Sequence, residues 1–471
     1  MPQSPDQILT AAQMRRAEEA LIAGGTNVDE LMQRAGRAAA EWVWRLSGGR
    51  AVTVLTGPGN NGGDGWVIAE ALRVRGGEVA VVMAAEPVTD AAKTARSLYQ
   101  GQVLPSDAEP SGEVLVDCLF GTGLTRPLSA AHMDLLQHLA ARHDKLVAVD
   151  LPSGVEADLG QRLNPDLPHC DLTIALGAWK FAHFLMPAAA SMGALKLVDI
   201  GIGEAAGAAQ ALTQPRFIAP KPAAHKYTRG LLGVVAGEMP GAALLAARAT
   251  QGAGAGYVKL FGWRSAAAAA PSVPADLVAG TQPLAQALSD KRLGAVLIGP
   301  GLGRDAAARA KLASALGKPV PAVLDADALM LLDPQLLADR DAALIATPHE
   351  GELAALERAF GLDGAGCKAS RAVALAKAGS MVVVAKGADT LIAAPDGRIA
   401  LSHCASSWLS TAGTGDVLAG IIASRLACGA DPFAAAREGV WLHGEAARLC
   451  APPFSASQLA DAVALAFASC L

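Results

Sequence analysis

The sequence predicts an α/β protein of two domains, each a parallel sheet covered by helices on both faces. The length, 471 residues, is about three times the common size of a single domain. Short apolar runs without polar alternation recur along the chain, and helical stretches separate them, which is typical of parallel strands buried on both faces. Each half also carries its own glycine-rich segment beside a strand or helix, and the two segments differ.

The composition is that of a folded protein with large buried cores. Apolar residues make up 52% of the chain and charged residues 18%, which excludes global disorder. The 39 basic and 44 acidic residues give a net charge of −5, and no run of five Lys or Arg occurs, so no nucleic-acid partner is expected. Alanine- and glycine-rich helices favour a homo-oligomer.

Targeting signals and cysteine patterns narrow the class further. No basic segment followed by an apolar core opens the chain, and no apolar stretch reaches the roughly 18 residues of a membrane span, so neither export nor a membrane is expected. The seven cysteines are scattered without a CxxC pair, which supports neither a disulfide framework nor a zinc site. We therefore expect a cytoplasmic location.

The first half, residues 1–210, is predicted to hold a helical segment followed by five buried strands. Apolar residues recur at roughly helical spacing over Ala11–Leu46. Strands are expected at Ala51–Thr56, Val79–Ala84, Val114–Leu119, Leu146–Val149 and Leu172–Leu176. Asn60, Asp117 and Asp150 stand at or just past strand ends. Open parallel sheets bind ligands beyond the carboxyl ends of their strands, so we expect these side chains at one edge.

A stretch rich in Ala, Gly, Pro and Gln separates the halves, and within it residues 211–224 are predicted to be a linker. The second domain is expected to span residues 225–471. Its predicted strands are Leu231–Ala236, Ala295–Gly299, Ala322–Leu324, Ala343–Ala346 and Met381–Ala385. A helix at Val417–Leu426 follows a glycine-rich turn.

The first glycine-rich segment, GPGNNGGDG over Gly57–Gly65, directly follows a predicted strand. Its five glycines let the backbone adopt positive φ and approach a ligand, and the helix expected after it offers unpaired N–H groups to an anion. The segment is neither a dinucleotide fingerprint nor a phosphate-binding loop with a terminal lysine, which disfavours nucleotide hydrolysis here. A plain strand-to-helix turn is the alternative, and Asn60, Asn61 and Asp64 favour a binding site over it.

Two further segments carry polar residues at predicted strand ends. VDCLFGTGLTRPL contains Asp117, and VAVDLPSGVEADLG contains Asp150 and Ser153. Each Asp alone is more typical of a cap or turn residue. Together with Asn61, these residues offer amide, carboxylate and hydroxyl oxygens suited to a hard cation.

These three segments resemble the NAD(P)H-hydrate epimerase domain, in which NNGGDG, D-x-x-x-G-T-G-L and D-x-P-S-G occur in this order, and the resemblance spans Ile8–Gly203. It implies a Rossmann-like three-layer sandwich in which Asn61, Asp117 and Ser153 hold K⁺. Asp150 would be the general acid/base, assisted by Lys180. The implied contacts to the hydrated nicotinamide are Asn60, Asn61, Gly62, Gly63, Asp64, Gly121, Thr122, Gly123, Leu124, Thr125, Arg126, Pro127 and Asp150.

The second glycine-rich segment, STAGTGDVLAGIIA over Ser410–Ala423, leads straight into the predicted helix. Gly413 and Gly415 free the backbone, so amides at the helix start can hold a transferring phosphoryl group. Asp416 lies where it could take the proton of an acceptor hydroxyl. The alternative is an N-cap Asp after a flexible turn.

The GTGD pattern resembles the ribokinase-like fold, and IGPGLG, VLDADAL and TPHEGEL narrow the resemblance to the ADP- or ATP-dependent NAD(P)H-hydrate dehydratases, over His225–Leu471. It implies a second three-layer sandwich with Asp416 as catalytic base. The implied hydrate contacts are Ala242, Gly301, His349 and Asp416, and the implied nucleotide contacts are Lys386, Gly387, Ala388, Asp389, Thr390 and Gly415. We also expect Asp325 and Asp327, two apart on one strand, to face the pocket or its metal together.

The combined expectation is one polypeptide that repairs hydrated NADH and NADPH. The first domain would interconvert the R and S hydrates. The second would phosphorylate the S hydrate with ADP or ATP and Mg²⁺, after which phosphate leaves. The alternative is a ribokinase-like small-molecule kinase fused to a ligand-binding domain without catalytic activity. No sequence feature separates ADP from ATP as the donor.

Overall fold

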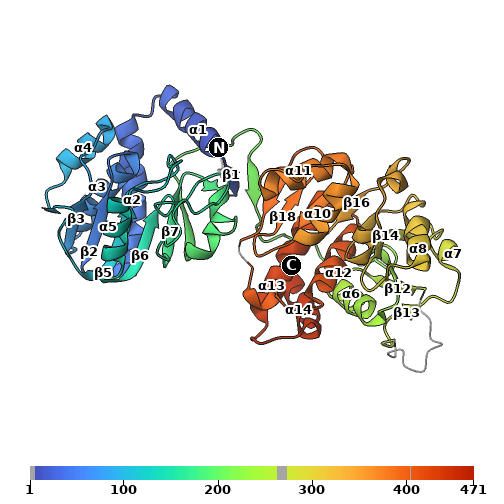
Figure 1. Ribbon diagram of the computed structural model, residues 1–471. Coiled ribbons are helices and arrows are strands. Elements are labelled where there is room, and N and C mark those ends of the chain that lie inside the picture. The colour runs from blue at the N-terminus through green and yellow to red at the C-terminus, as the bar shows by residue number, and fades with distance from the viewer. Residues whose placement is uncertain (1–5, 263–272, 404) are drawn as a thin grey trace. The chain divides into compact units, whose positions relative to one another are not determined.

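The computed structural model describes residues 6–262, 273–403 and 405–471. The chain divides into two compact units, Met1–Ala211 and Leu212–Leu471, and each is an α/β body (Figure 1). Cys404, one of the seven cysteines, lies outside the described residues, and the other six are free thiols. Within the described ranges, every helix is too short or too polar to cross a bilayer.

The main sheet of unit 1 is parallel throughout, with the strand order β4-β3-β2-β5-β6-β7-β9. Its strands are β2 (Val52–Thr56), β3 (Val79–Met83), β4 (Gln102–Leu104), β5 (Gly112–Cys118), β6 (His143–Val149), β7 (Leu172–Leu176) and β9 (Ala194–Val198). From β2 the chain continues towards one edge of the sheet through β3 and β4, and from β5 it continues towards the other edge through β6, β7 and β9. The strand order therefore reverses between β2 and β5. All five strands predicted for the first half are present. The two additional strands, β4 and β9, are partly exposed edge strands, so they lack the continuous apolar run on which the prediction depends.

Helices cover both faces of this sheet, which confirms the predicted three layers. They are α1 (Ala11–Ala23), α2 (Val28–Ser47), α3 (Asn60–Val74), α4 (Asp90–Leu98) and α5 (Ala130–Ala140), with short 3-10 helices η1 (Phe181–His183) and η2 (Ala188–Ser191). Val54 and Val116 pack in one core with α2, α3 and α4. Leu55 and Leu115, one position away, pack in a second core with α5. Successive strand residues thus alternate between two buried faces.

Two predictions for unit 1 are wrong in detail. The helical stretch Ala11–Leu46 is two helices, because Gly25 adopts a φ of 99° and Asn27 caps α2 by accepting a hydrogen bond from the Asp29 N–H. The segment NNGGDG is the start of α3 rather than a loop. None of the five glycines of Gly57–Gly65 has a positive φ. Four of them allow close packing, because a Cβ at any of these positions would lie within 3.0 Å of a neighbouring atom: Gly57, Gly62, Gly63 and Gly65.

A small three-stranded ribbon places α1 over the sheet edge. It consists of β1 (Gln7–Leu9), β8 (Trp179–Lys180) and β10 (Ala209–Ala211). β1 pairs in parallel with β8, where Leu9 is in register with Lys180, and antiparallel with β10. Because α1 follows β1 after one residue, this pairing brings its first turns close to Lys180.

The sheet of unit 2 has the strand order β13-β12-β11-β14-β15-β16-β17-β18-β19, parallel as far as β17 and antiparallel for the last two. The strands are β11 (Leu231–Val235), β12 (Tyr257–Phe261), β13 (Val278–Ala279), β14 (Leu293–Ile298), β15 (Ala322–Leu324), β16 (Leu344–Ala346), β17 (Val382–Ala385), β18 (Leu391–Ala393) and β19 (Ile399–Leu401). All five strands predicted for the second half are present.

Helices also cover both faces of the unit 2 sheet. They are α6 (Pro240–Gly252), α7 (Leu284–Ala287), α8 (Ala306–Leu316), α9 (Asp327–Leu331), α10 (Glu350–Ala359), α11 (Lys368–Ala378), α12 (Thr414–Ala427), α13 (Pro432–Leu449) and α14 (Ala456–Ala468), with η3 (Pro334–Leu337) and η4 (Ser407–Leu409). α6, α12 and α13 share one core with the sheet. α8 and α11 contact the sheet outside that core (Figure 1). The predicted helix Val417–Leu426 lies inside α12.

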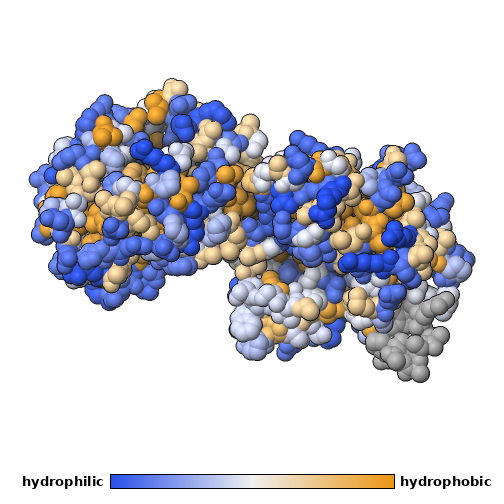
Figure 2. Space-filling model, in the orientation of Figure 1, coloured by the Kyte–Doolittle hydropathy of each residue, from blue (hydrophilic) through white to orange (hydrophobic). Residues whose placement is uncertain are grey.

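The first residues of the predicted linker pack on unit 2. Leu212 N–H donates to the Leu401 carbonyl oxygen at 2.9 Å. The Phe217 ring stacks on the Phe467 ring at 4.5 Å, under the Arg425 guanidinium. On each unit, the visible surface mixes hydrophilic and hydrophobic residues (Figure 2).

Candidate active sites

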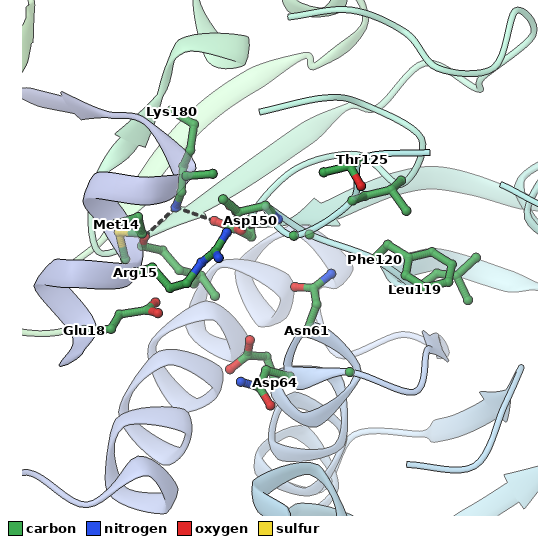
Figure 3. Close-up of a pocket in the computed structure, with 18 of the residues that line it drawn as sticks. Met14, Arg15, Glu18, Asn61, Asp64, Leu119, Phe120, Thr125, Asp150 and Lys180 are labelled. Carbon is green, nitrogen blue, oxygen red and sulfur yellow. Dashed lines mark hydrogen bonds and ion pairs between the residues drawn. The ribbon is translucent and has the colours of Figure 1, made fainter. Parts of the chain in front are cut away.

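A cavity of about 570 Å³ opens at the carboxyl edge of the unit 1 sheet, where the strand order reverses (Figure 3). Ligands of open parallel sheets bind at this place. The start of α3, the turn after β5 and helix α1 wall the cavity. The predicted site residues that line it are Asn60, Asn61, Asp64, Gly121, Thr122, Gly123, Leu124, Thr125, Arg126, Asp150 and Lys180.

Three residues predicted to contact the hydrate, Gly62, Gly63 and Pro127, are not part of the cavity lining. Gly62 and Gly63 are buried in the first turn of α3. A Cβ on Gly62 would lie 1.9 Å from the Gly57 carbonyl oxygen, and one on Gly63 would lie 2.5 Å from the Met32 methyl carbon. These glycines therefore let the helix start pack against its neighbours.

Close backbone approach also brings the three walls of the cavity together. A Cβ on Gly57, at the end of β2, would lie 1.8 Å from the Leu119 carbonyl oxygen after β5. A Cβ on Gly121 would lie 3.0 Å from Asp150 Oδ2 and 3.2 Å from Asn61 Cγ. Glycine at position 121 therefore lets the turn after β5 lie close to both the amide of Asn61 and the carboxylate of Asp150.

Asp150 and Lys180 form a buried ion pair on the cavity wall. Lys180 Nζ lies 2.5 Å from Asp150 Oδ1 and donates to the Leu176 carbonyl oxygen at 2.8 Å. The other carboxylate oxygen of Asp150 accepts hydrogen bonds from the backbone N–H of Thr122, at 3.0 Å, and from its hydroxyl. The Asp150 backbone is left-handed, with a φ of 66°. The structure thus joins the two residues predicted for proton transfer.

The pKa values of the three carboxyl groups of the cavity are shifted in different directions. Burial raises the pKa of Asp150, but the Lys180 ammonium and the Thr122 hydrogen bonds outweigh burial and hold this pKa below its ordinary value. Burial and the negative charge of Asp150 raise the pKa of both Asp64 and Glu18. A pair of carboxyl groups whose pKa values are driven apart can serve as base and acid in one site.

Of the predicted cation ligands, Asn61 lines the cavity, whereas Asp117 and Ser153 are not part of its lining. Asp117 is 1% exposed, and its Oδ1 accepts a hydrogen bond from the Ser153 hydroxyl at 2.7 Å. Burial raises the pKa of Asp117. Asn61 is next to Gly121, and both its amide nitrogen and oxygen are buried without a hydrogen-bond partner among the described residues. Unpartnered amide oxygen and a buried carboxylate without a basic partner are features that a bound cation would satisfy.

Helix α1 contributes four cavity residues that the sequence motifs did not indicate: Ala11, Met14, Arg15 and Glu18. Figure 3 labels the last three of them. Arg15 extends towards Asp150 in this view, and Glu18 lies nearer Asp64. Positions three and four apart share one face of a helix. This spacing is the only feature of the sequence that groups these residues. It does not indicate which face of the helix lines a cavity.

Lys386, directly after β17, is the centre of the site in unit 2. Its Nζ lies 2.6 Å from Asp325 Oδ1 and 3.7 Å from Glu352 Oε2. The Thr347 hydroxyl donates to the same Asp325 oxygen at 2.7 Å. Burial lowers the pKa of Lys386, but the two carboxylates outweigh burial and raise it above its ordinary value. The ammonium is therefore charged at neutral pH.

Asp416 lies in the first turn of α12. Gly413, with a φ of 93°, occupies the N-cap position, so the alternative of Asp416 as an N-cap is wrong. Burial and the negative charge of Asp325 raise the pKa of Asp416 to about 7, against the opposing charge of Lys386. A Cβ on Gly415 would lie 3.6 Å from Lys386 Nζ. The predicted base and two predicted nucleotide residues therefore lie together, with a carboxyl pKa suited to a general base.

The prediction that Asp325 and Asp327 share one strand is wrong. Strand β15 ends at Leu324, Ala326 adopts a φ of 49°, and Asp327 begins α9. Asp325 pairs with Lys386, whereas Asp327 accepts from the Gly303 N–H and pairs with Arg304. Ala326, with its positive φ, ends the strand geometry in which residues two apart point to the same face. The two carboxylates therefore contact different partners, Lys386 and Arg304.

The KGADT segment forms a closed turn after Lys386. The Thr390 hydroxyl donates to the Gly387 carbonyl oxygen at 2.8 Å. Asp389 Oδ1 pairs with Lys368 Nζ at 2.6 Å, and the same ammonium donates to the Asp389 carbonyl oxygen. Ala388 carbonyl oxygen accepts from Ala405 N–H. Lys368 fixes this turn, and no sequence motif indicated it.

His349, predicted to contact the hydrate, is the N-cap of α10. The His349 ring nitrogen Nδ1 accepts from the Glu352 backbone N–H at 3.2 Å, and the His349 backbone N–H donates to Glu352 Oε2 at 2.8 Å. Glu352 thereby links His349 to Lys386. Gly301 and Ala242 are neighbours, because a Cβ on Gly301 would lie 3.1 Å from the Ala242 Cβ.

Comparisons with known proteins cover both units. Residues 232–466 match the family model described as NAD(P)H-hydrate dehydratase, and residues 28–182 match the YjeF-related protein N-terminus. The chain is 35% identical to the bifunctional NAD(P)H-hydrate repair enzyme Nnr of Mycobacterium tuberculosis, over 88% of each chain, and 33% identical to that of Moorella thermoacetica, over 88% of this chain and 87% of the relative. A solved ADP/ATP-dependent NAD(P)H-hydrate dehydratase from Bacillus subtilis, 29% identical with a TM-score of 0.48, covers 54% of this chain and 95% of its own. The chain belongs to the family of bifunctional NAD(P)H-hydrate repair enzymes.

Proposed function

We propose that this protein repairs hydrated NADH and NADPH, with unit 1 interconverting the R and S hydrates and unit 2 dehydrating the S hydrate. The observation that carries the proposal is the Asp150–Lys180 pair in the unit 1 cavity. The same chain is 35% identical, over 88% of its length, to a curated bifunctional repair enzyme. One chain with both activities makes chemical sense, because a dehydratase selective for one epimer leaves the other unrepaired.

Epimerisation needs proton transfers and no redox step. The carbon that carries the hydroxyl is bonded to the ring nitrogen. Its C–N bond can break when the hydroxyl loses its proton to a base and the nitrogen gains a proton, which leaves a carbonyl group. The nitrogen can then attack this carbonyl from the other face, and the two protons return. Asp150, kept ionised by Lys180 and Thr122, is the base that takes the proton. Asp64, whose pKa is raised by burial and by the negative charge of Asp150, faces the same cavity.

We assign K⁺ to Asn61, Asp117 and Ser153. The buried, unpartnered amide oxygen of Asn61 and the buried carboxylate of Asp117 support a cation there. Bound K⁺ would supply positive charge next to the substrate pocket. Replacing K⁺ by a large organic cation should lower the epimerisation rate, and Ser153→Ala should raise the K⁺ concentration for half-maximal rate. An epimerisation rate independent of K⁺ would contradict this assignment.

Dehydration in unit 2 begins with phosphoryl transfer from ADP or ATP to the C6 hydroxyl of the S hydrate. Asp416 takes the hydroxyl proton, and amides at the start of α12 and Lys386 stabilise the charge on the phosphoryl group. The turn Gly387–Thr390 would hold the nucleotide, and Mg²⁺ bound with the nucleotide would offset the negative charge of the phosphates. Phosphate then leaves and restores the dihydropyridine, because phosphate is a far better leaving group than hydroxide.

The direct test is the recovery of NADH absorbance from a mixture of both NADH-hydrate epimers with ADP or ATP, Mg²⁺ and K⁺. The wild-type chain should convert both epimers, whereas Asp416→Ala should convert neither while still exchanging them. A stable phosphorylated product would instead support the small-molecule kinase alternative, which the dehydratase family model does not favour. The proposal also includes a homo-oligomeric state and a cytoplasmic location. Sedimentation of the purified chain measures the oligomeric state.

A further inference from the structure

The Asp150 backbone needs support that its own side chain does not give. A non-glycine residue with a positive φ is strained, and Asp150 has a φ of 66° directly after β6. Its N–H donates to the Ile174 carbonyl oxygen at 2.7 Å, which secures one side of the residue. Its carbonyl oxygen lies 2.9 Å from His183 Nε2. His183 is therefore the hydrogen-bond partner of the Asp150 carbonyl group.

The same imidazole contacts the backbone of the partner residue in the ion pair. The Lys180 N–H, which can only donate, lies 2.9 Å from His183 Nδ1. His183 Nδ1 consequently carries a lone pair, and the ring proton sits on Nε2, where it donates to the Asp150 carbonyl oxygen. The opposite tautomer would lose both hydrogen bonds and keep only a 3.2 Å contact between Nδ1 and the Lys180 carbonyl oxygen.

The surroundings keep this imidazole neutral and fixed. His183 is 1% exposed, and the Trp179 ring packs edge-on against it with centroids 5.4 Å apart. Burial and the nearby Lys180 ammonium lower the pKa of His183 to about 4. His183 is not part of the cavity lining, so it does not touch the substrate.

We propose that His183 is a positioning residue for epimerisation: its Nε2–H tautomer ties the left-handed backbone of Asp150 to the backbone of Lys180. These two residues are 30 positions apart, and their side chains form the 2.5 Å ion pair on the cavity wall. One rigid ring between the two backbones fixes the direction in which the carboxylate and the ammonium point. This inference rests on the proposed epimerase function of unit 1.

The test compares two replacements of His183 in the full chain. Phe keeps the ring and removes both hydrogen bonds, whereas Gln keeps an N–H donor near the position of Nε2. His183→Phe should lower kcat for epimer exchange about 10- to 100-fold with KM nearly unchanged, since small displacements of reacting groups have effects of this size. His183→Gln should recover most of the lost kcat.

The chain contains two internal controls. His143, a half-buried histidine of unit 1, contacts the Thr53 hydroxyl and the Leu139 carbonyl oxygen far from the cavity lining, so His143→Phe should leave epimer exchange unchanged. Dehydration of purified S hydrate by unit 2 should be the same in all variants. Equal loss of kcat in the Phe and Gln variants, or an unchanged kcat in His183→Phe, would overturn the proposal.

A measurement independent of activity separates this inference from the proposed function. In wild-type chain with ¹⁵N-labelled histidine, two imidazoles, those of His183 and His443, should show the Nε2–H tautomer without titration between about pH 5 and 8. His183→Gln should remove one of these two sets of signals and leave that of His443. A proton on Nδ1 would overturn the positioning role. Failure of the wild-type chain to exchange epimers, with the expected NMR signals present, would instead contradict the proposed function.

Discussion

Asp150 combines a left-handed backbone with a buried, ionised side chain, and its neighbours explain both features. Asp tolerates this conformation better than most residues because its short polar side chain can bond locally. Thr122 and Lys180 satisfy its carboxylate, and Ile174 and His183 satisfy its backbone. Hydrogen bonds and one ion pair thereby hold an ionised carboxylate beside the cavity.

Asp150→Asn should abolish epimerisation and leave the fold intact. Asn keeps the size and the tolerance of a positive φ but cannot accept the proton, so the rate should fall about 10²- to 10⁴-fold. The variant also leaves the Lys180 ammonium buried without a counter-charge, which lowers stability. Epimer exchange and thermal unfolding measure the two effects.

The double variant Asp150→Asn with Lys180→Met is the matched control. Since it removes the buried charge as well, it should recover part of the lost melting temperature and none of the activity. Retained epimerisation in either variant would contradict the role of Asp150.

The pKa of Asp416 predicts the pH dependence of dehydration. The pKa is raised from 3.8 to about 7, so the carboxyl group is protonated below neutral pH and cannot act as a base. The value of kcat/KM for the S hydrate should therefore rise with pH through about 7 and then level off. A profile that is flat between pH 5.5 and 8.5, in buffers of about constant ionic strength, would contradict Asp416 as the base.

At the scale of elements, glycines decide how closely the helices of both units pack. In unit 1, Gly36 on α2 faces α3, where a Cβ would lie 2.5 Å from the Val67 Cβ. In unit 2, Gly420 on α12 faces α6, where a Cβ would lie 2.2 Å from the Ala246 carbonyl oxygen. Asp416 lies in the first turn of α12. The close packing of α12 on α6 therefore fixes the distance of the predicted base from the sheet.

Gly420→Ala should destabilise unit 2 by about 1–3 kcal/mol, since the added methyl group overlaps a backbone atom that cannot move alone. Gly444→Ala is the matched control. Gly444 lies on α13, and among the described residues no atom from outside the adjoining helical backbone would lie within 4 Å of a Cβ at this position. The control should be neutral or more stable by up to about 1 kcal/mol, from the higher helix propensity of alanine. Urea unfolding of both variants measures the difference, and equal effects would refute the packing argument.

At the scale of the whole molecule, each unit holds its own cores and every residue assigned to its own reaction. The cores around β2–β7 belong to unit 1, and those around β11–β18 and α14 belong to unit 2. Asp150, Lys180 and the proposed cation ligands lie in the first unit, whereas Lys386 and Asp416 lie in the second. The two activities therefore need no shared residue.

Chains 1–211 and 212–471 produced separately should each fold and keep one activity. The first should exchange the epimers without nucleotide. The second should consume the S hydrate and leave the R hydrate, and mixing the two should complete the conversion. Chromatographic separation of the epimers follows each step. Consumption of both epimers by the second chain alone would remove the need for the first.

Much of the fold and of the site could be predicted because local patterns carry them. Unbroken apolar runs indicated the central strands β2, β5 and β14, and strand-end acids indicated Asp150. Other features have no local pattern. Arg15 and Glu18 reach the cavity only because β1 pairs beside Lys180, and Lys368 joins the nucleotide turn across 21 residues.

The sequence by itself determined the α/β class, the central strands, the family and most of the side chains at both sites, because these depend on residue type and short-range spacing. Only the tertiary structure decided that NNGGDG begins a helix, that Asp325 and Asp327 contact different neighbours, and in which direction the pKa of each buried carboxyl group is shifted. Those outcomes depend on burial and on distances between residues far apart in the chain, which exist only once the elements pack.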